Sequence, residues 1–217
     1  MMPARLPRVH LVTELSGTDL PSRVAAGVAG LPPRAVAVHL RAKELAGKEL
    51  LALARALRLV TSAAGQALLV NDRLDVALLA GADGVHLPAA GIPPGDARRL
   101  LGPGALVGVS CHSTDEVARA RAAGADFATF GPVFDTPSKR IFGPPLGLDR
   151  LREAAAIGLP LVGLGGVQEA NAVAVVAAGA FGVAAIRAWL SADDPGAAVR
   201  RLLSVADARI RGPGSSR

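Results

Sequence analysis

Three polar side chains alternate along one short segment of the chain. His39, Arg41 and Lys43 are separated by the single residues Leu40 and Ala42 at the end of an apolar run. Alternate residues of an extended strand point to one face, so the three side chains are expected to share a face. Such groups are costly beside an apolar core unless they meet an anion or carboxylates. The segment therefore indicates an anionic ligand, with a structural ion pair as the alternative for Arg41 and an exposed loop position for Lys43.

Polar side chains also follow two later apolar runs. Asn71 and Asp72 come directly after the first, and Ser110 and His112 lie at the end of the second. The Asp72 oxygens suit a divalent cation, although an aspartate at such a boundary commonly caps the next helix, and capping is favoured here. Ser110 and His112 are candidate ligand contacts. The alternative for His112 is a loop histidine without a chemical task, which is the usual case for a lone histidine.

The loop over residues 131–146 carries hydroxyls and cations that suit phosphate oxygens. It contains Thr136, Ser138 and Lys139, and lysine occurs at only three positions in the chain. Lys139 is therefore a candidate catalytic cation, and Thr136 and Ser138 are candidate substrate contacts.

Two later segments predict a phosphate cradle. Gly165 and Gly166 lie at the end of the seventh apolar run, and Ile186 and Arg187 end the eighth. Backbone N–H groups of glycines and of a helix start can approach an anion closely, and such sites recur after the last two strands of (β/α)8 barrels.

All these positions follow short apolar runs that alternate with segments of helical periodicity. Eight such pairs predict a single (β/α)8 TIM barrel over residues 1–211 with a disordered tail at 212–217, and the alternative is an open doubly wound sheet. The absence of an early Gly-x-Gly-x-x-Gly fingerprint favours the barrel. Strands are predicted at 9–14, 35–41, 67–72, 84–87, 106–111, 127–133, 159–167 and 181–187. Helices are predicted near 19–30, 44–64, 73–80, 94–101, 114–123, 147–157, 169–178 and 194–211.

Similar glycine-containing turns recur where a predicted helix ends and the next strand begins. They are Gly81-Ala82-Asp83, Gly124-Ala125-Asp126 and Gly179-Ala180-Phe181. Glycine just past a helix end readily adopts the left-handed conformation, so these turns mark the lower side of the barrel, opposite the candidate site.

Composition favours one globular domain without a membrane or nucleic-acid partner. The chain has 217 residues, and 51% of them are hydrophobic, which suffices for one core. No apolar run reaches the roughly 18 residues of a membrane span, and no secretory signal is recognisable, so a cytoplasmic location is expected. The net charge of +6 comes mainly from dispersed arginines, and aromatic residues make up only 3%. We therefore expect no nucleic-acid partner.

The single cysteine, Cys111, excludes an intrachain disulfide and a multi-cysteine metal site. The sequence does not fix the oligomeric state. A homodimer stays an open alternative, because many barrels of this size form dimers.

Short motifs, in order from Val9 to about Pro195, resemble those of the thiamine phosphate synthase family. The matching stretches are Leu11-Val12-Thr13, Leu40-Arg41-x-Lys43, Asn71-Asp72-Arg73, Gly81 to Leu87, Gly108-Val109-Ser110, Gly131 to Phe134 with Thr136 to Lys139, and Gly165-Gly166. The resemblance implies a transferase that joins hydroxymethylpyrimidine pyrophosphate to thiazole phosphate. In that family magnesium helps pyrophosphate to leave, and the thiazole nitrogen attacks the resulting pyrimidine carbocation.

The resemblance also implies roles for the matching residues. The pyrophosphate would lie among Arg41, Lys43, Asn71 and Lys139. Asp72 would bind Mg²⁺, Ser110 and Thr136 would line the substrates, and Gly166 with the loop after the eighth strand would hold the thiazole phosphate. Cations and a metal ion at these places would offset the charge that builds up on the leaving pyrophosphate.

Several positions depart from the family pattern. Gly91 stands where the synthases have a second acidic magnesium ligand, so that ligand is absent. His39 replaces a usual glutamine, Ser138 a usual threonine, and Arg187 a serine that normally contacts phosphate.

The lost acidic ligand is similar to the thiazole tautomerase branch of the family, which isomerises a thiazole carboxylate phosphate without metal. In that alternative His39 or His112 would act as the base. The histidine base typical of the branch is replaced here by Pro132. A third alternative is a non-catalytic binder of thiamine-pathway phosphates.

Overall fold

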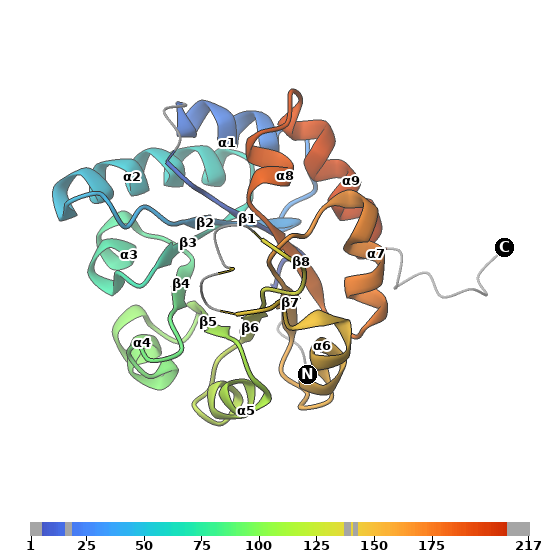
Figure 1. Cartoon of the computed structure of the whole chain (residues 1–217). Helices are drawn as coiled ribbons and strands as arrows, with labels where there is room; N and C mark the ends of the chain where they lie inside the picture. The colour runs from blue at the N-terminus through green and yellow to red at the C-terminus, as the bar shows by residue number, and fades with distance from the viewer. Residues whose placement is uncertain (1–5, 16–18, 137–139, 141–142, 208–217) are drawn as a thin grey trace, which may run out of the picture.

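Eight parallel strands form a closed barrel in a computed structural model that describes residues 6–15, 19–136, 140 and 143–207 (Figure 1). Neighbouring strands pair in chain order, and β1 also pairs with β8. The predicted (β/α)8 barrel is confirmed, and the open sheet is excluded. The strands are β1 (Val9–Val12), β2 (Val36–Leu40), β3 (Ala67–Asn71), β4 (Gly84–Leu87), β5 (Leu106–Cys111), β6 (Phe127–Phe130), β7 (Leu161–Gly163) and β8 (Gly182–Ala185).

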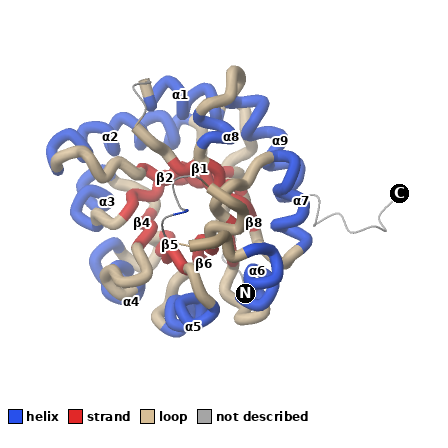
Figure 2. Tube along the Cα trace, viewed as in Figure 1, coloured by secondary structure: helices blue, strands red, loops and turns tan. Residues whose placement is uncertain are grey.

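Helices surround the strands, as Figure 2 shows in blue around the red barrel. Their apolar faces pack on the outer face of the barrel and form the larger of the two apolar cores. The helices are α1 (Leu20–Val28), α2 (Gly47–Ala63), α3 (Leu74–Ala80), α4 (Pro94–Leu101), α5 (Thr114–Ala122), α6 (Gly147–Ala155), α7 (Glu169–Ala177), α8 (Arg187–Leu190) and α9 (Pro195–Asp207).

Two elements near the end of the chain differ from the prediction. The sequence predicts a seventh strand over 159–167, whereas β7 ends at Gly163. It ends early because Gly165 and Gly166 have φ angles of 96° and 65°, outside the extended region. The phosphate cradle implies a helix start after the eighth strand, but the predicted helices do not include α8, because a helix of one turn is too short to show helical periodicity.

Alternate strand residues point into the barrel and fill it with side chains. The smaller, inner core contains Phe127 with aliphatic residues from seven other segments, including Val12, Leu69 and Val162. A Cβ atom on Gly108 would lie 2.2 Å from the Phe127 ring, so the ring occupies the space that a side chain at Gly108 would need. The barrel is therefore a packed core, and a ligand can reach it only at its ends.

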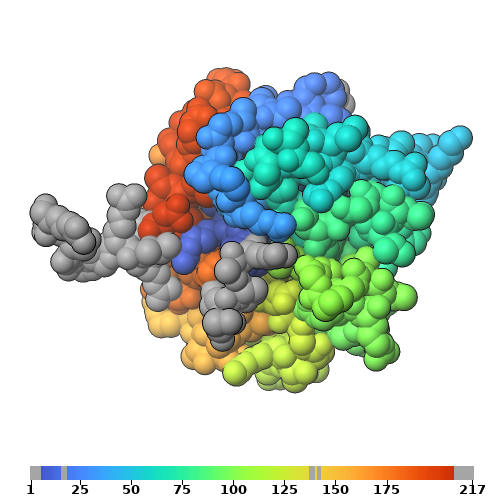
Figure 3. All heavy atoms as spheres, turned by 180° about the vertical axis from the view of Figure 1, so that it is seen from behind, coloured from blue at the N-terminus to red at the C-terminus, as the bar shows by residue number. Residues whose placement is uncertain are grey.

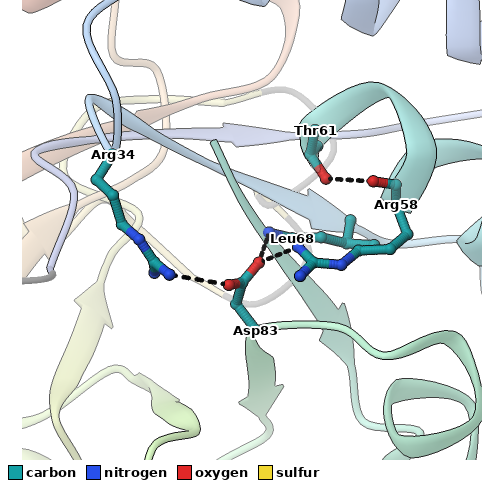
Figure 4. A network of polar contacts seen from close by, with 5 residues as sticks. All are labelled: Arg34, Arg58, Thr61, Leu68 and Asp83. Atoms are coloured by element: carbon teal, nitrogen blue, oxygen red, sulfur yellow. Dashed lines mark hydrogen bonds and ion pairs between the residues drawn. The ribbon is translucent and has the colours of Figure 1, made fainter. Parts of the chain in front are cut away.

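Asp83 fastens the lower end of the barrel beside β3 and β4 (Figure 4). Its carboxylate accepts a hydrogen bond from the backbone N–H of Leu68 at 2.9 Å. It also pairs with Arg58 at 2.6 Å and with Arg34 at 3.2 Å. The aspartate of this Gly-Ala-Asp turn thus joins a strand, a helix and a loop.

The second Gly-Ala-Asp turn repeats the arrangement. The Asp126 carboxylate accepts a hydrogen bond from Val107 N at 2.8 Å and pairs with Arg98 at 2.9 Å. In the third turn an aromatic ring replaces the carboxylate, and the Arg8 guanidinium lies 4.5 Å from the centroid of Phe181. The three turns lie on the lower side of the barrel, as the sequence predicts.

Figure 3 shows the molecule from behind, with the dark blue N-terminal segment near the middle of the view. Among the helices of the described ranges, none is long and apolar enough to cross a membrane. The predicted tail at 212–217 lies outside the described residues.

Candidate active site

A cavity of about 250 Å³ opens at the mouth of the barrel, beside the carboxyl ends of β5 to β8. The structure places seven of the predicted site residues in its wall. They are Ser110, His112, Thr136, Gly165, Gly166, Ile186 and Arg187. These residues come from four separate βα segments, so the closed barrel is what gathers them around one space.

The two glycines after β7 are required by a close approach of the loop after β6. A Cβ atom on Gly165 would lie 2.5 Å from Pro132, and one on Gly166 would lie 2.7 Å from Phe134. The loop is fastened there by a hydrogen bond from Phe134 N to Gly165 O at 3.0 Å. Within the described part of the chain, the N–H groups of Gly165 and Gly166 donate to no other protein group. Backbone donors of this kind suit an anion.

His112 is held in one tautomer at the edge of the cavity. Its Nδ1 lies 2.6 Å from the carbonyl oxygen of Gly131. A carbonyl can only accept, so Nδ1 carries the proton and, in the neutral ring, Nε2 is an acceptor. The segment is also anchored by Ser113, whose hydroxyl caps α5 by accepting from Glu116 N at 3.2 Å. His112 can therefore accept a hydrogen bond from a ligand.

An ion pair moderates the negative charge of one wall residue. Asp135 lines the cavity, and its carboxylate accepts hydrogen bonds from Arg140, with Arg140 Nε at 3.0 Å from Oδ1. This hydrogen bonding holds the pKa of Asp135 below its usual value. The paired aspartate repels an anionic ligand less than an unpaired one would.

Arg41, Lys43, Asn71 and Asp72 form a second group, at the ends of β2 and β3. The strand register pairs Leu40 with Val70, which places Arg41 next to Asn71 across the two strands. The Arg41 backbone N–H donates to the buried Thr13 hydroxyl at 3.0 Å, which ties this end of β2 to β1. None of these four residues belongs to the wall of the 250 Å³ cavity, so the structure separates them from the set that lines it.

Asp72 does not cap the next helix. Arg73 occupies the position before α3, and no side chain caps that helix. Asp72 is exposed and has a φ of 64°, a left-handed conformation that is uncommon outside glycine. The capping interpretation is therefore wrong, and the Asp72 carboxylate projects from a constrained turn.

A magnesium site here would have few protein ligands. The described residues contain no cluster of three or more His, Cys, Asp or Glu side chains arranged to hold a metal ion. The loop that begins at Pro88 contains Gly91, which has no carboxylate, at the position where the family resemblance implies a second acidic ligand. Magnesium commonly uses only one or two carboxylates and takes its remaining ligands from phosphates and water. Asp72 alone fits that pattern if the substrate supplies the other oxygens.

His39 lies deeper than predicted. Its ring is only 2% exposed, and its Nε2 lies 2.7 Å from Nδ1 of His10 inside the barrel. Burial lowers the pKa of His39 well below its ordinary value. The expectation that His39 meets an anionic ligand together with Arg41 and Lys43 is wrong, because His39 occupies an interior layer beneath them.

A third histidine completes this layer. His86 packs 5.0 Å from His39, centroid to centroid, and its Nε2 lies 3.0 Å from the hydroxyl of Thr129. Thr129 in turn lines the cavity. The layer therefore forms part of the support beneath the cavity.

Some predicted residues lie elsewhere, and sequence reasoning missed others. Ser138 and Lys139 lie outside the described residues. Glu14 lines the cavity, and alternation from His10 through Val12 could have identified it.

Cys111 is buried, and burial raises the pKa of its thiol to about 12, so it is not a reactive thiol.

The chain is similar to proteins of one family along most of its length. A family model described as thiamine monophosphate synthase matches residues 9–189. The thiamine-phosphate synthase of Methanoculleus marisnigri is 48% identical over 186 residues, which cover 85% of each chain. That of Moorella thermoacetica is 44% identical over 205 residues, covering 94% of this chain and 96% of the relative. A solved structure of thiamine phosphate pyrophosphorylase from Pyrococcus furiosus matches with a TM-score of 0.82 and 29% identity, over 93% of this chain and 96% of that one.

Proposed function

Because the chain belongs to the thiamine monophosphate synthase family, we propose that it is the transferase that joins hydroxymethylpyrimidine pyrophosphate to thiazole phosphate. The observation that carries this proposal is the near full-length similarity to thiamine-phosphate synthases, at 44% identity over 94% of the chain for one relative. The geometry supports it, because polar residues line a cavity beside β5 to β8 and further polar residues lie at the carboxyl ends of β2 and β3.

The reaction breaks one bond and forms one bond. The C–O bond between the pyrimidine methylene carbon and pyrophosphate breaks, and its electron pair leaves with the pyrophosphate oxygen. The thiazole nitrogen then donates its lone pair to that carbon, which gives thiamine phosphate. The protein must neutralise charge on the leaving group and hold the two reactants in line.

We assign the leaving pyrophosphate to the group at the ends of β2 and β3. The Arg41 guanidinium and the Lys43 ammonium offset its negative charge, and the Asn71 amide donates hydrogen bonds to its oxygens. Lys139, from the loop after β6, is proposed as a further cation. Asp72 would hold Mg²⁺, which when bound neutralises charge on the pyrophosphate oxygens.

The thiazole phosphate is assigned to the cavity beside β7 and β8. Backbone N–H groups of Gly165 and Gly166 donate to the phosphate, and Arg187 supplies charge in place of the serine usual in the family. Ser110, Thr136 and Ser138 are proposed substrate contacts. Ile186 contributes an apolar surface for the thiazole ring.

The alternatives receive no support. The relatives reported above are named as synthases or pyrophosphorylases rather than isomerases. His39, one of the two candidate bases for a tautomerase, is buried and hydrogen-bonded to another histidine. No similarity favours a non-catalytic binder.

The test is a synthase assay of purified protein with both substrates and Mg²⁺, followed by chromatography of thiamine phosphate. Product should require both substrates and should disappear when a chelator removes the metal. Absence of product at high enzyme concentration would contradict the proposal. Both substrates are water-soluble phosphates, so we expect the enzyme to act in the cytoplasm. Sedimentation of the same preparation would show whether the protein is a homodimer.

A further inference from the structure

An arginine on α1 holds the end of α8, on the far side of α8 from the cavity. Arg23 Nε donates to the carbonyl oxygen of Leu190 at 2.9 Å, and Nη2 donates to that of Trp189 at 3.4 Å. Nη2 also donates to the carbonyl oxygen of Ala192. The last carbonyls of a helix lack partners within it, and a planar guanidinium can satisfy several at once. One side chain therefore gathers three carbonyls at the end of this short helix.

The opposite end of the same helix is the wall of the cavity. Ile186, Arg187 and Ala188 all line it. The helix has one turn, so the wall and the residues that Arg23 holds are joined directly: Leu190 N donates to Ile186 O at 3.0 Å, and Ser191 N donates to Arg187 O at 3.1 Å. A rotation of α8 at the Arg23 end would move the wall by a similar amount.

A buried tryptophan also packs this helix against α1. Trp189 is fully buried, and its Nε1 donates to Ala185 O at 3.1 Å. Its ring packs on α1 at Gly27, where a Cβ atom would lie 3.5 Å from the ring. α1 and α8 lie side by side in Figure 1. Trp189 and the buried Leu190 hold the helix against the core, and the three hydrogen bonds from Arg23 fix the carbonyl groups at its end.

We infer that Arg23 is a positioning residue for the β8–α8 wall, and that it sets the affinity for the thiazole phosphate without touching it. This inference rests on the proposed function. Arg23 is not among the residues that line the cavity, so its effect must pass through α8. The residues proposed to bind pyrophosphate, Arg41, Lys43 and Asn71, lie at or just after the ends of β2 and β3 and are not part of α8. Arg23 should therefore affect one substrate and spare the other.

Steady-state kinetics of Arg23→Gln test this selectivity. We expect the KM for thiazole phosphate to rise about tenfold. The KM for hydroxymethylpyrimidine pyrophosphate and kcat at saturation should stay within about twofold of wild type. Lysine keeps the positive charge but lacks the planar set of donors of arginine. The KM of Arg23→Lys for thiazole phosphate should therefore lie between those of wild type and Arg23→Gln. If Arg23→Gln does not fold, Arg23→Lys carries the test, with an intermediate rise in the same KM expected.

Arg121→Gln is the matched control. Arg121 on α5 also donates to a carbonyl just past a helix end, that of Ile157 after α6, but on the lower side of the barrel. It should change neither KM. An unchanged KM for thiazole phosphate in the Arg23 variants, or equal rises in both KM values, would overturn the inference while leaving the proposed function intact. Wild-type protein that makes no thiamine phosphate would overturn both.

Discussion

Nε2 of His39 lies 2.7 Å from Nδ1 of His10 inside the closed barrel. His10 Nε2 is 3.0 Å from the carbonyl oxygen of Pro7, which can only accept, so His10 Nε2 carries a proton. In the neutral ring Nδ1 then accepts from His39 Nε2–H. The barrel interior is thus built on uncharged imidazoles, and protonating them would place charge in an apolar core.

The buried histidines should make stability fall with acidification between pH 7 and 5. Burial lowers the pKa of His10 to about 4 and that of His86 to about 3, from 6.5, and it also lowers that of His39. The unfolded chain therefore binds protons that the folded chain does not. The stabilisation is complete above pH 6.5 and is lost as pH falls toward 4. Each histidine should cost about 1.4 kcal/mol per pH unit below 6.5.

Urea unfolding at pH 7.5, 6 and 5 would measure this slope. A free energy of unfolding that is flat over this range would show that the histidines are not buried in neutral form.

Gly108→Ala should destabilise the barrel by about 1–3 kcal/mol, since a Cβ atom there would overlap the Phe127 ring. Thermal unfolding compared with Gly104→Ala provides the check. A Cβ atom on Gly104 has no atom within 4 Å, so that variant should stay near wild type. Equal melting temperatures for the two variants would argue against Phe127 filling the barrel axis.

Asp126→Ala should lower the free energy of unfolding by about 1–3 kcal/mol and leave activity intact, because it removes the partner of Val107 N and Arg98 at the lower end. The matched change is Asp149→Ala. It breaks an exposed pair with Arg152 and should cost less than about 1 kcal/mol. Loss of activity in folded Asp126→Ala protein would contradict the assignment of the active site to the opposite end of the barrel.

Gly166→Ala should raise the KM for thiazole phosphate at least about tenfold, because its Cβ atom would push on Phe134 and displace the glycine N–H groups. Gly30→Ala controls for backbone strain. Gly30 has a similar φ of 67°, but a Cβ atom there has no atom within 4 Å. Gly30→Ala should reduce stability without changing KM. If the two glycine variants have the same KM for thiazole phosphate, the N–H groups of Gly165 and Gly166 do not bind its phosphate.

Periodicity and turn chemistry were enough to predict the barrel. Each apolar run of the sequence contains one observed strand, and the Gly-Ala-Asp turns predicted the lower side, where Asp83 and Asp126 lie. These features are local, so they can be read without knowing how the strands pair.

Depth and short elements could not be predicted in the same way. Alternation shows that His39 points inward, but only the strand register shows that it sits beneath Arg41, against His10. The prediction that Asp72 caps the next helix is wrong, because Asp72 has a φ of 64° and the helix begins only after Arg73. α8 and its contact with Arg23 depend on packing between segments about 165 residues apart, which no local pattern records.

The proposed reaction at the barrel mouth transfers a pyrimidine group from pyrophosphate to thiazole phosphate. The most direct measurement is a single-turnover reaction, with enzyme in excess over both substrates, in which thiamine phosphate and pyrophosphate are both quantified. We predict equal amounts of the two products, formed at the same rate. Release of pyrophosphate without thiamine phosphate, or no turnover of either substrate, would show that the protein does not catalyse this transfer.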